Sequence, residues 1–229
     1  MMSDLISSPA ELRELSLVRL TTEAIFRMIG DGRLRPGQRL VENDLSAQLG
    51  VGRSPLREAF RILTERGALV SLPRRGTYVR ALTAETIDDI YTARRCIEIF
   101  SLSELMARPS DATVAQLQAA ISELGRAASA EDVRSVIAAD LDFHARIVDA
   151  SGSSRLVEAF GRLRFDMNFA LLFAQGCYGD LAFAAAGHLK IVDAIRSGDS
   201  AAAQLCLSEH IEDGRRNLRR VFEHIKSND

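Results

Sequence analysis

Apolar residues recur along most of the chain at helical spacing, and Gly, Pro and Ser separate the periodic segments. In the first third this pattern predicts helices at residues 15–30, 41–49 and 54–66, the last with Ser54 as its N-cap. The runs "LVSL" and "TYVRA", separated by "PRRG", predict a small β-hairpin with a basic tip. Three helices followed by a hairpin are typical of a winged helix-turn-helix, which we expect over residues 10–80.

The rest of the chain carries only helical patterns. Six helices are predicted, at residues 84–108, 111–127, 131–150, 154–175, 180–197 and 200–226. The segments "SGSS" and "GCYGD" are two of the breaks between them, and Ser110, Ser129 and Ser153 or Ser154 are candidate caps. We therefore expect a mostly α protein, with an N-terminal winged helix-turn-helix and a C-terminal all-α six-helix bundle over residues 84–226.

Charge is distributed unevenly between these two parts. The net charge of the whole chain is −2, yet residues 33–80 hold 10 Arg and no Lys against 4 acidic residues. Residues 81–229 hold 16 basic and 22 acidic side chains. The first part can therefore meet a polyanion, whereas the second cannot.

The sequence favours a cytoplasmic protein that does not enter a membrane. No apolar run approaches the roughly 18 to 20 residues that cross a bilayer. The N-terminal segment lacks a basic region followed by an apolar one, so no export signal is expected. The three cysteines, Cys96, Cys177 and Cys206, form no CxxC pair, and their odd number suits a reducing compartment in which each is a small core residue.

Arginines cluster where a winged helix-turn-helix meets DNA. The second helix of the predicted pair begins with Arg53, Ser54 and Arg57, and the start of that helix enters the major groove in this fold. The planar fork of an arginine matches the O6 and N7 acceptors of guanine. Arg74 and Arg75 at the hairpin tip can reach a phosphate or the minor groove. The alternative is that these arginines form an ordinary solvated face.

A second candidate site lies in the helical part. Asp140 and His144 are four residues apart, which places both on one helix face, and His188 and His210 lie on later helices. Neutral imidazoles with one carboxylate suit Zn, Ni, Co or Mn better than Ca or Mg. Spacing alone does not show that the three helices converge, so isolated core or surface histidines are the alternative. The fourth histidine, His224, is better explained as a partner of the last helix's dipole.

The N-terminal part resembles a known family. "GRLRPGQRLVENDLSAQLGVGRSPLREAFRILTERGALVSLPRRGTYV" is similar to the DNA-binding domain of the GntR-type bacterial transcription regulators. The resemblance implies DNA contacts from the helix-turn-helix and the wing, at Asn43, Gly52, Arg53, Ser54, Arg57, Arg75 and Gly76. Gly52 and Asn43 depart from the usual residues of the family.

The C-terminal part resembles the FCD effector domain of the FadR-like branch, in its smaller VanR-like six-helix group. "RRCIE" at 94–98, "DLDFH" at 140–144, the histidine of "HLKIVDAI" at 188 and "HI" at 210 match motifs of that domain. The resemblance implies that Asp140, His144, His188 and His210 bind one divalent transition metal, with Zn favoured and Ni, Co or Mn as alternatives. Gly187 departs from the family, which often has an acidic residue there.

The same resemblance gives Arg94 a role in binding an effector, whereas helical spacing equally favours a salt bridge from Arg94 to Glu98. We therefore expect a homodimeric regulator, with repression as the favoured mode, that binds double-stranded DNA at a short inverted repeat and responds to a small carboxylate. The chain is not expected to be an enzyme. Alternatives are a metal-dependent enzyme fused to a DNA-binding head, which would need a general acid or base near the metal, and a purely structural metal.

Overall fold

The computed structural model describes the backbone of residues 9–174 and 182–227, and the side chains of residues 15–174 and 187–224. The chain divides into two compact units, and the division falls between Ala81 and Leu82. Within the described residues, no helix is both long enough and apolar enough to span a bilayer. Each unit is described by itself below.

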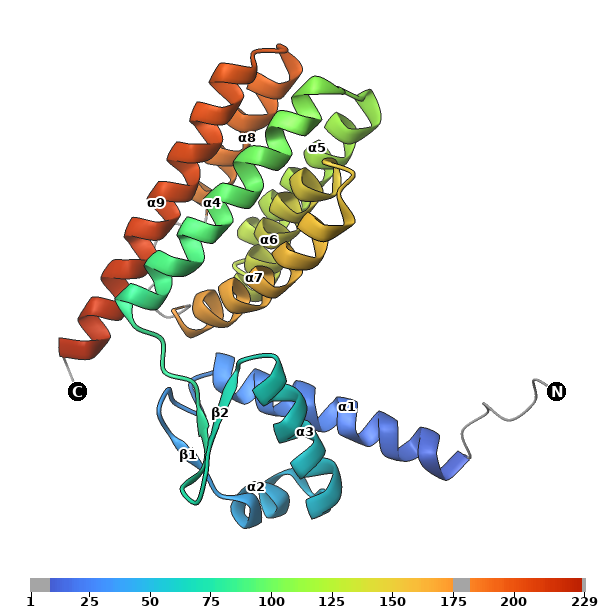
Figure 1. Cartoon of the computed structure of the whole chain (residues 1–229), viewed down its shortest axis with the longest axis vertical. Coiled ribbons are helices and arrows are strands. Elements are labelled where there is room, and N and C mark those ends of the chain that lie inside the picture. Colours follow the sequence, from blue (N-terminus) through green and yellow to red (C-terminus); the bar gives the residue numbers. More distant parts are fainter. Residues whose placement is uncertain (1–8, 175–181, 228–229) are drawn as a thin grey trace. The chain divides into compact units, whose positions relative to one another are not determined.

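The first unit is a winged helix-turn-helix (Figure 1). Its elements are α1 (Pro9–Gly30), β1 (Arg39–Leu40), α2 (Glu42–Leu49), α3 (Arg53–Glu65), β2 (Leu69–Leu72) and β3 (Gly76–Val79). The strands form one antiparallel sheet in the order β1-β3-β2. Helix α3 buries Leu56, Ala59, Phe60 and Leu63, whose spacing turns them to one side, and it packs against α1 and α2.

Two details of this unit differ from the sequence prediction. The sheet has a third strand, β1, which is too short to show an alternating pattern. Helix α3 begins at Arg53, and its N-cap is Gly52 without a side-chain hydrogen bond, so the prediction of Ser54 as cap is wrong. Ser54 lies instead in the first turn of α3, where its side chain is exposed.

The second unit consists of helices throughout its described residues (Figure 1). They are α4 (Ala84–Ala107), α5 (Asp111–Ser129), α6 (Val133–Asp149), α7 (Ser154–Phe173), α8 (Ala182–Arg196) and α9 (Ser200–Ser227). Helix α4 packs against α6, α7 and α9, while α8 packs against α5 and α9. The hydrophobic core of this unit consists of fully buried apolar side chains, among them Leu102, Leu117, Leu124, Phe143, Ile147 and Leu207. The predicted fold class is confirmed.

The caps of this unit agree with the sequence prediction in part. Ser153 caps α7 by accepting a hydrogen bond from the Leu156 amide, as expected. Ser129 was expected to cap the next helix, but α5 runs through it and Asp132 caps α6 instead. The expectation that the cysteines lie in the core is wrong for Cys96, which is exposed. The predicted break at "GCYGD" and Cys177 lie outside the described residues.

Candidate functional site

Three helices of the second unit bring Asp140, His144, His188 and His210 together. Asp140 and His144 lie one turn apart on α6, His188 lies on α8 and His210 on α9. Each offers a carboxylate oxygen or ring nitrogen, and these four atoms all lie within 4.8 Å of one another. His144 and His188 are fully buried, and the other two are partly buried. The convergence that spacing alone could not show is therefore present.

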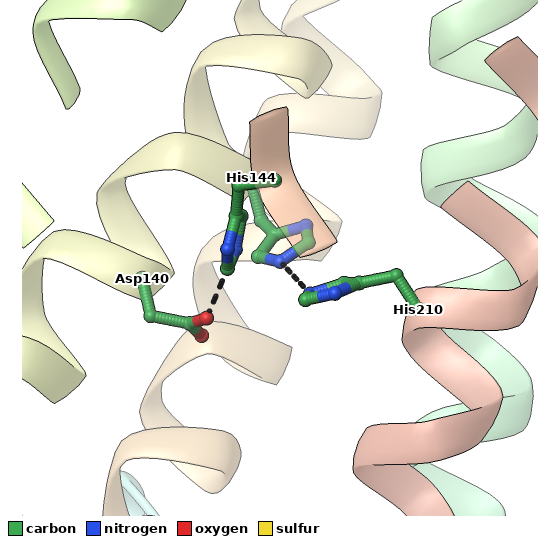
Figure 2. A group of neighbouring side chains, drawn as sticks. Asp140, His144 and His210 are labelled. Carbon is green, nitrogen blue, oxygen red and sulfur yellow. Dashed lines mark hydrogen bonds and ion pairs between the residues drawn. The ribbon is translucent and has the colours of Figure 1, made fainter. Parts of the chain in front are cut away.

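The ring nitrogens are turned toward one common point. His144 Nε2 lies 3.2 Å from His210 Nε2, and His188 Nε2 lies 3.1 Å from Asp140 Oδ1. Figure 2 shows Asp140, His144 and His210 reaching toward one another from their helices. Phe143 packs edge-on against the rings of His144 and His188 and closes one side with an apolar wall. Such a wall restricts rotation of both rings.

The protonation states of these groups suit a metal. Burial, together with the nearby Arg94 charge, lowers the pKa of His144, and burial together with His188 and His144 lowers that of His210 well below its ordinary value. Both rings are thus neutral at pH 7 and keep lone pairs. Burial alone would raise the pKa of Asp140, but the hydrogen bond from His188 and the Arg94 charge hold it below its ordinary value. One carboxylate and three imidazoles form a donor set that fits a divalent transition metal.

Sequence reasoning missed the part that Glu98 plays at this centre. Its carboxylate is fully buried, accepts a 2.6 Å hydrogen bond from Arg94 Nε at Oε1, and places Oε2 2.6 Å from His144 Nδ1. The salt bridge that helical spacing allowed between Arg94 and Glu98 is present. Burial would raise the pKa of Glu98, but Arg94 and the hydrogen bond to His144 lower it, so the carboxylate is charged. It is already engaged on both sides, which leaves it unsuited to act as a general base.

Arg94 still has hydrogen-bonding capacity at the centre. Its side chain is 3% exposed, and its Nη2 atom is buried without a hydrogen-bond partner among the described residues. Tyr91, one turn earlier on α4, lies with its ring 5.3 Å from the Arg94 guanidinium carbon. A buried, charged donor without an acceptor is costly unless a ligand supplies one. The geometry is therefore compatible with an anion bound beside the four candidate ligands.

Gly187 lies directly against the centre. A Cβ atom at this position would lie 2.8 Å from His210 Nδ1, closer than real Cβ contacts come. In this backbone, any side chain at position 187 would therefore push the His210 ring aside. The glycine permits the close approach of α8 and α9 at His210.

The predicted DNA-contacting residues are exposed in the first unit. Asn43 lies on α2, and Gly52, Arg53, Ser54 and Arg57 lie at the turn and first turns of α3. The Arg57 guanidinium is partly held by Glu42, with Nε 2.9 Å from Oε2.

The wing carries the other predicted contacts. Arg74 and Arg75 lie at the tip of the β2–β3 hairpin and are exposed. The turn there uses positive φ angles of 62° at Arg74 and 106° at Gly76. A Cβ at Gly76 would also meet the Arg39 guanidinium, with Nε at 3.2 Å, so glycine lets Arg39 lie beside the tip.

Comparisons with known proteins match both units. The model of the gntR family of bacterial regulatory proteins matches residues 18–79, and the FCD domain model matches residues 89–213. The "Probable D-xylose utilization operon transcriptional repressor" of Paenarthrobacter nicotinovorans is 31% identical over 187 residues, which cover 82% of each chain. The gluconate operon transcriptional repressor of Bacillus subtilis is 27% identical over 201 residues, covering 86% of this chain and 82% of the repressor.

A solved structure has the same fold. Escherichia coli McbR/YncC superposes with a TM-score of 0.72 at 22% identity, over 89% of this chain and 97% of that one. At this identity the likeness speaks for the fold alone. The two family models and the two relatives point to the same family, and the solved structure has the same fold.

Proposed function

Because the chain belongs to the gntR family of bacterial regulatory proteins and carries an FCD domain, we propose that it is a repressor whose operator affinity is set by a small organic acid bound at a metal ion. Its membership makes it a DNA-binding transcription regulator. The relatives are transcription regulators, so the prediction that the chain is not an enzyme is confirmed. The metal, the effector, the operator and the dimer are the parts that we propose.

The observation that carries the proposal is the convergence of Asp140, His144, His188 and His210 beside a buried arginine nitrogen. These four residues would hold a divalent transition metal, with zinc favoured and nickel, cobalt or manganese as alternatives. When bound, the ion supplies positive charge and coordination positions that a carboxylate can fill. Arg94 Nη2 would donate to a second oxygen of the same anion as a charge-assisted partner.

The effector class follows from this charge. An ion and an arginine in a buried site favour an anion with several oxygen atoms, so we propose a small carboxylate. The relative named for the gluconate operon supports this choice, because gluconate is a hydroxy acid of that kind. A purely structural metal is the second candidate function, since an ion held by the same four residues would also stabilise the helical bundle when no effector is bound.

The first unit would read the operator. We assign residues 10–80 to DNA binding and residues 84–226 to metal binding, effector binding and dimerisation. Arg53, Ser54 and Arg57 would face base edges, supported by Asn43 and Gly52, while Arg75 and Gly76 would meet the backbone or the minor groove. One recognition helix covers only a few base pairs, so a homodimer on a short inverted repeat is proposed. A regulator of this kind acts where the chromosome is, which favours the cytoplasm.

Control would operate by a shift of population. If the effector binds more tightly to a conformation that fits the operator poorly, operator affinity falls by the same differential free energy. The typical coupling between two sites is about 1 to 3 kcal/mol, which is a change of roughly 5- to 150-fold in affinity. No chemical step is required of the protein.

Metal binding is tested first. Purified wild type, His188→Ala/His210→Ala and the exposed control His224→Ala are compared by elemental analysis after loading with Zn²⁺ and desalting. We expect one ion per chain in the wild type and the control, and loss of the ion in the double variant. Retention of the ion in the double variant would contradict the four-ligand site.

Effector control is tested next on a DNA duplex selected by the wild-type protein from a randomised pool. A panel of organic and sugar acids is screened by thermal shift, and the acids that stabilise the protein are then tested for release of that duplex. Stabilisation by metal without any acid that releases DNA would favour the structural metal.

A further inference from the structure

Glu98 is bound on two sides within the core of the second unit. It comes from α4, whereas the candidate metal ligands come from α6, α8 and α9. The carboxylate is 0% exposed, with Arg94 Nε 2.6 Å from Oε1 and His144 Nδ1 2.6 Å from Oε2. Both oxygens are therefore committed, and the side chain cannot turn without losing one of its partners.

We propose that Glu98 is a positioning residue that fixes His144 in the tautomer able to bind a metal. The inference rests on the proposed metal site. It adds to that site Glu98, which is not one of the four candidate ligands. Glu98 does not ligate the ion itself. It acts through the hydrogen bond to the far side of the His144 ring.

The argument follows from donor and acceptor chemistry. A neutral imidazole has one N–H, on either Nδ1 or Nε2, and an ionised carboxylate can only accept. The 2.6 Å contact between His144 Nδ1 and Glu98 Oε2 therefore places the proton on Nδ1. His144 Nε2 is left with its lone pair, and this is the atom that faces His210 Nε2 at 3.2 Å. This nitrogen is the one that a metal would use.

Arg94 stabilises this tautomer of His144 by holding the Glu98 carboxylate. Its Nε–H donates to Glu98 Oε1, so the carboxylate is held in place and in its charged form within an apolar core. A hydrogen bond of this kind behind a ligating histidine orients the ring and makes it a stronger ligand. Arg94, Glu98 and His144 thus form a chain that runs from α4 to the metal-facing nitrogen.

Glu98→Gln is the sharpest perturbation, because it keeps the shape and removes one acceptor. A carboxamide has one oxygen and one NH₂ group, while Arg94 and His144 Nδ1–H both require an acceptor. The charged Arg94 takes the oxygen, so the NH₂ group faces His144. The ring must then accept at Nδ1 and carry its proton on Nε2, which blocks that nitrogen as a ligand.

The tautomer is measured directly on the metal-free, full-length protein. Long-range ¹H–¹⁵N spectra of ¹⁵N-histidine-labelled chain at neutral pH distinguish the two tautomers, and the chain has only four histidines to assign. His144→Gln identifies the resonance. We expect the proton on Nδ1 in the wild type and on Nε2 in Glu98→Gln. A wild-type ring that carries its proton on Nε2, or on both nitrogens, would overturn the proposal without recourse to any variant of Glu98.

Metal affinity is the second measurement. Competition between the protein and a chromophoric chelator for Zn²⁺ should show affinity weakened by about 10- to 100-fold in Glu98→Gln, the usual effect of removing such a partner. Glu104→Gln, on the exposed side of α4 in an ion pair with Arg108, is the matched control and should bind like the wild type.

The two proposals fail differently. If His188→Ala/His210→Ala loses the ion while Glu98→Gln binds it like the wild type, only the role of Glu98 is wrong. If the double variant keeps the ion, the proposed metal site itself is wrong.

Discussion

Gly187 offers a sharp test of the proposed metal centre, because even a methyl side chain at this position should damage it. In Gly187→Ala the new methyl group would lie 2.8 Å from His210 Nδ1, and ordinary contact begins at 3.4 Å. The His210 ring must therefore retreat by about 0.6 Å or tilt. Metal–ligand distances tolerate deviations of only about 0.2 Å, so the bond from His210 is lost or strongly weakened.

The expected magnitude can be worked out. A ligand displaced in this way should weaken metal binding by about 10- to 100-fold, the range seen when the support of a ligand is removed. At a fixed excess of metal, the stabilisation that the metal gives then falls by about 1.4 to 2.7 kcal/mol. The alanine itself favours the α8 helix by about 0.5 to 1 kcal/mol, so the metal-free variant can even gain stability. A clash with His210 should therefore lower the stability that metal adds, while the stability of the metal-free variant stays the same or rises.

The assay compares urea unfolding of the second unit with and without Zn²⁺, alongside chelator competition. Gly125→Ala and Gly161→Ala are matched controls, because both glycines lie within helices and a Cβ at either position meets nothing within 4 Å. Both controls should keep the full stabilisation by metal. If Gly187→Ala also keeps it, His210 is not a ligand in the arrangement described, and the reasoning fails.

Three further predictions concern other parts of the chain. Unfolding of the metal-free protein below pH 6.5 should take up protons, because folding lowers the pKa of His144 and His210. The free energy of unfolding should therefore decrease as the pH is lowered below 6.5, by up to about 1.4 kcal/mol per pH unit for each histidine; a free energy of unfolding that does not change with pH, measured by urea titration in the presence of chelator, would refute this. Arg57→Ala should weaken binding to the selected duplex by about 1 to 3 kcal/mol in fluorescence anisotropy, with unchanged circular dichroism; unaltered affinity would exclude its role in recognition. Ser153→Ala should cost about 1 kcal/mol of stability in chemical unfolding, and Ser154→Ala much less, because only Ser153 caps α7; equal losses would contradict the cap.

The sequence predicted the helices well because their apolar periodicity is itself the cause of their packing. It missed β1 because Arg39–Leu40 is paired only through β3, which lies almost forty residues further along the chain. It placed a cap at Ser129 because serine favours that role, but α5 continues through Ser129, and Glu131, at a φ of 54°, lies in the turn that follows. Local propensity gave way to packing in both cases.

The four candidate ligands could be predicted, whereas their support could not. Asp140 and His144 share a helix face, so their spacing is informative. Glu98 was identified only as a partner for Arg94, one turn away on α4, and nothing local connects it with His144. Their contact joins positions 46 residues apart, so only the packing of α4 on α6 reveals it. The four-residue spacing of Arg94 and Glu98 was the one signal that the sequence offered.

Because α6, α8 and α9 converge on one point, an ion bound there would act as a reversible cross-link between them. An ion held by Asp140 and His210 would close a long loop of chain, much as a disulfide does, and closing a longer loop removes more freedom from the unfolded chain. Unlike a disulfide, this link needs no oxidant and can be undone by a chelator. The candidate ligand His210 lies on α9, so a chain that is still being synthesised, or that has been cut before α9, cannot complete this link. Full metal affinity would thus report that the whole bundle has been made and folded.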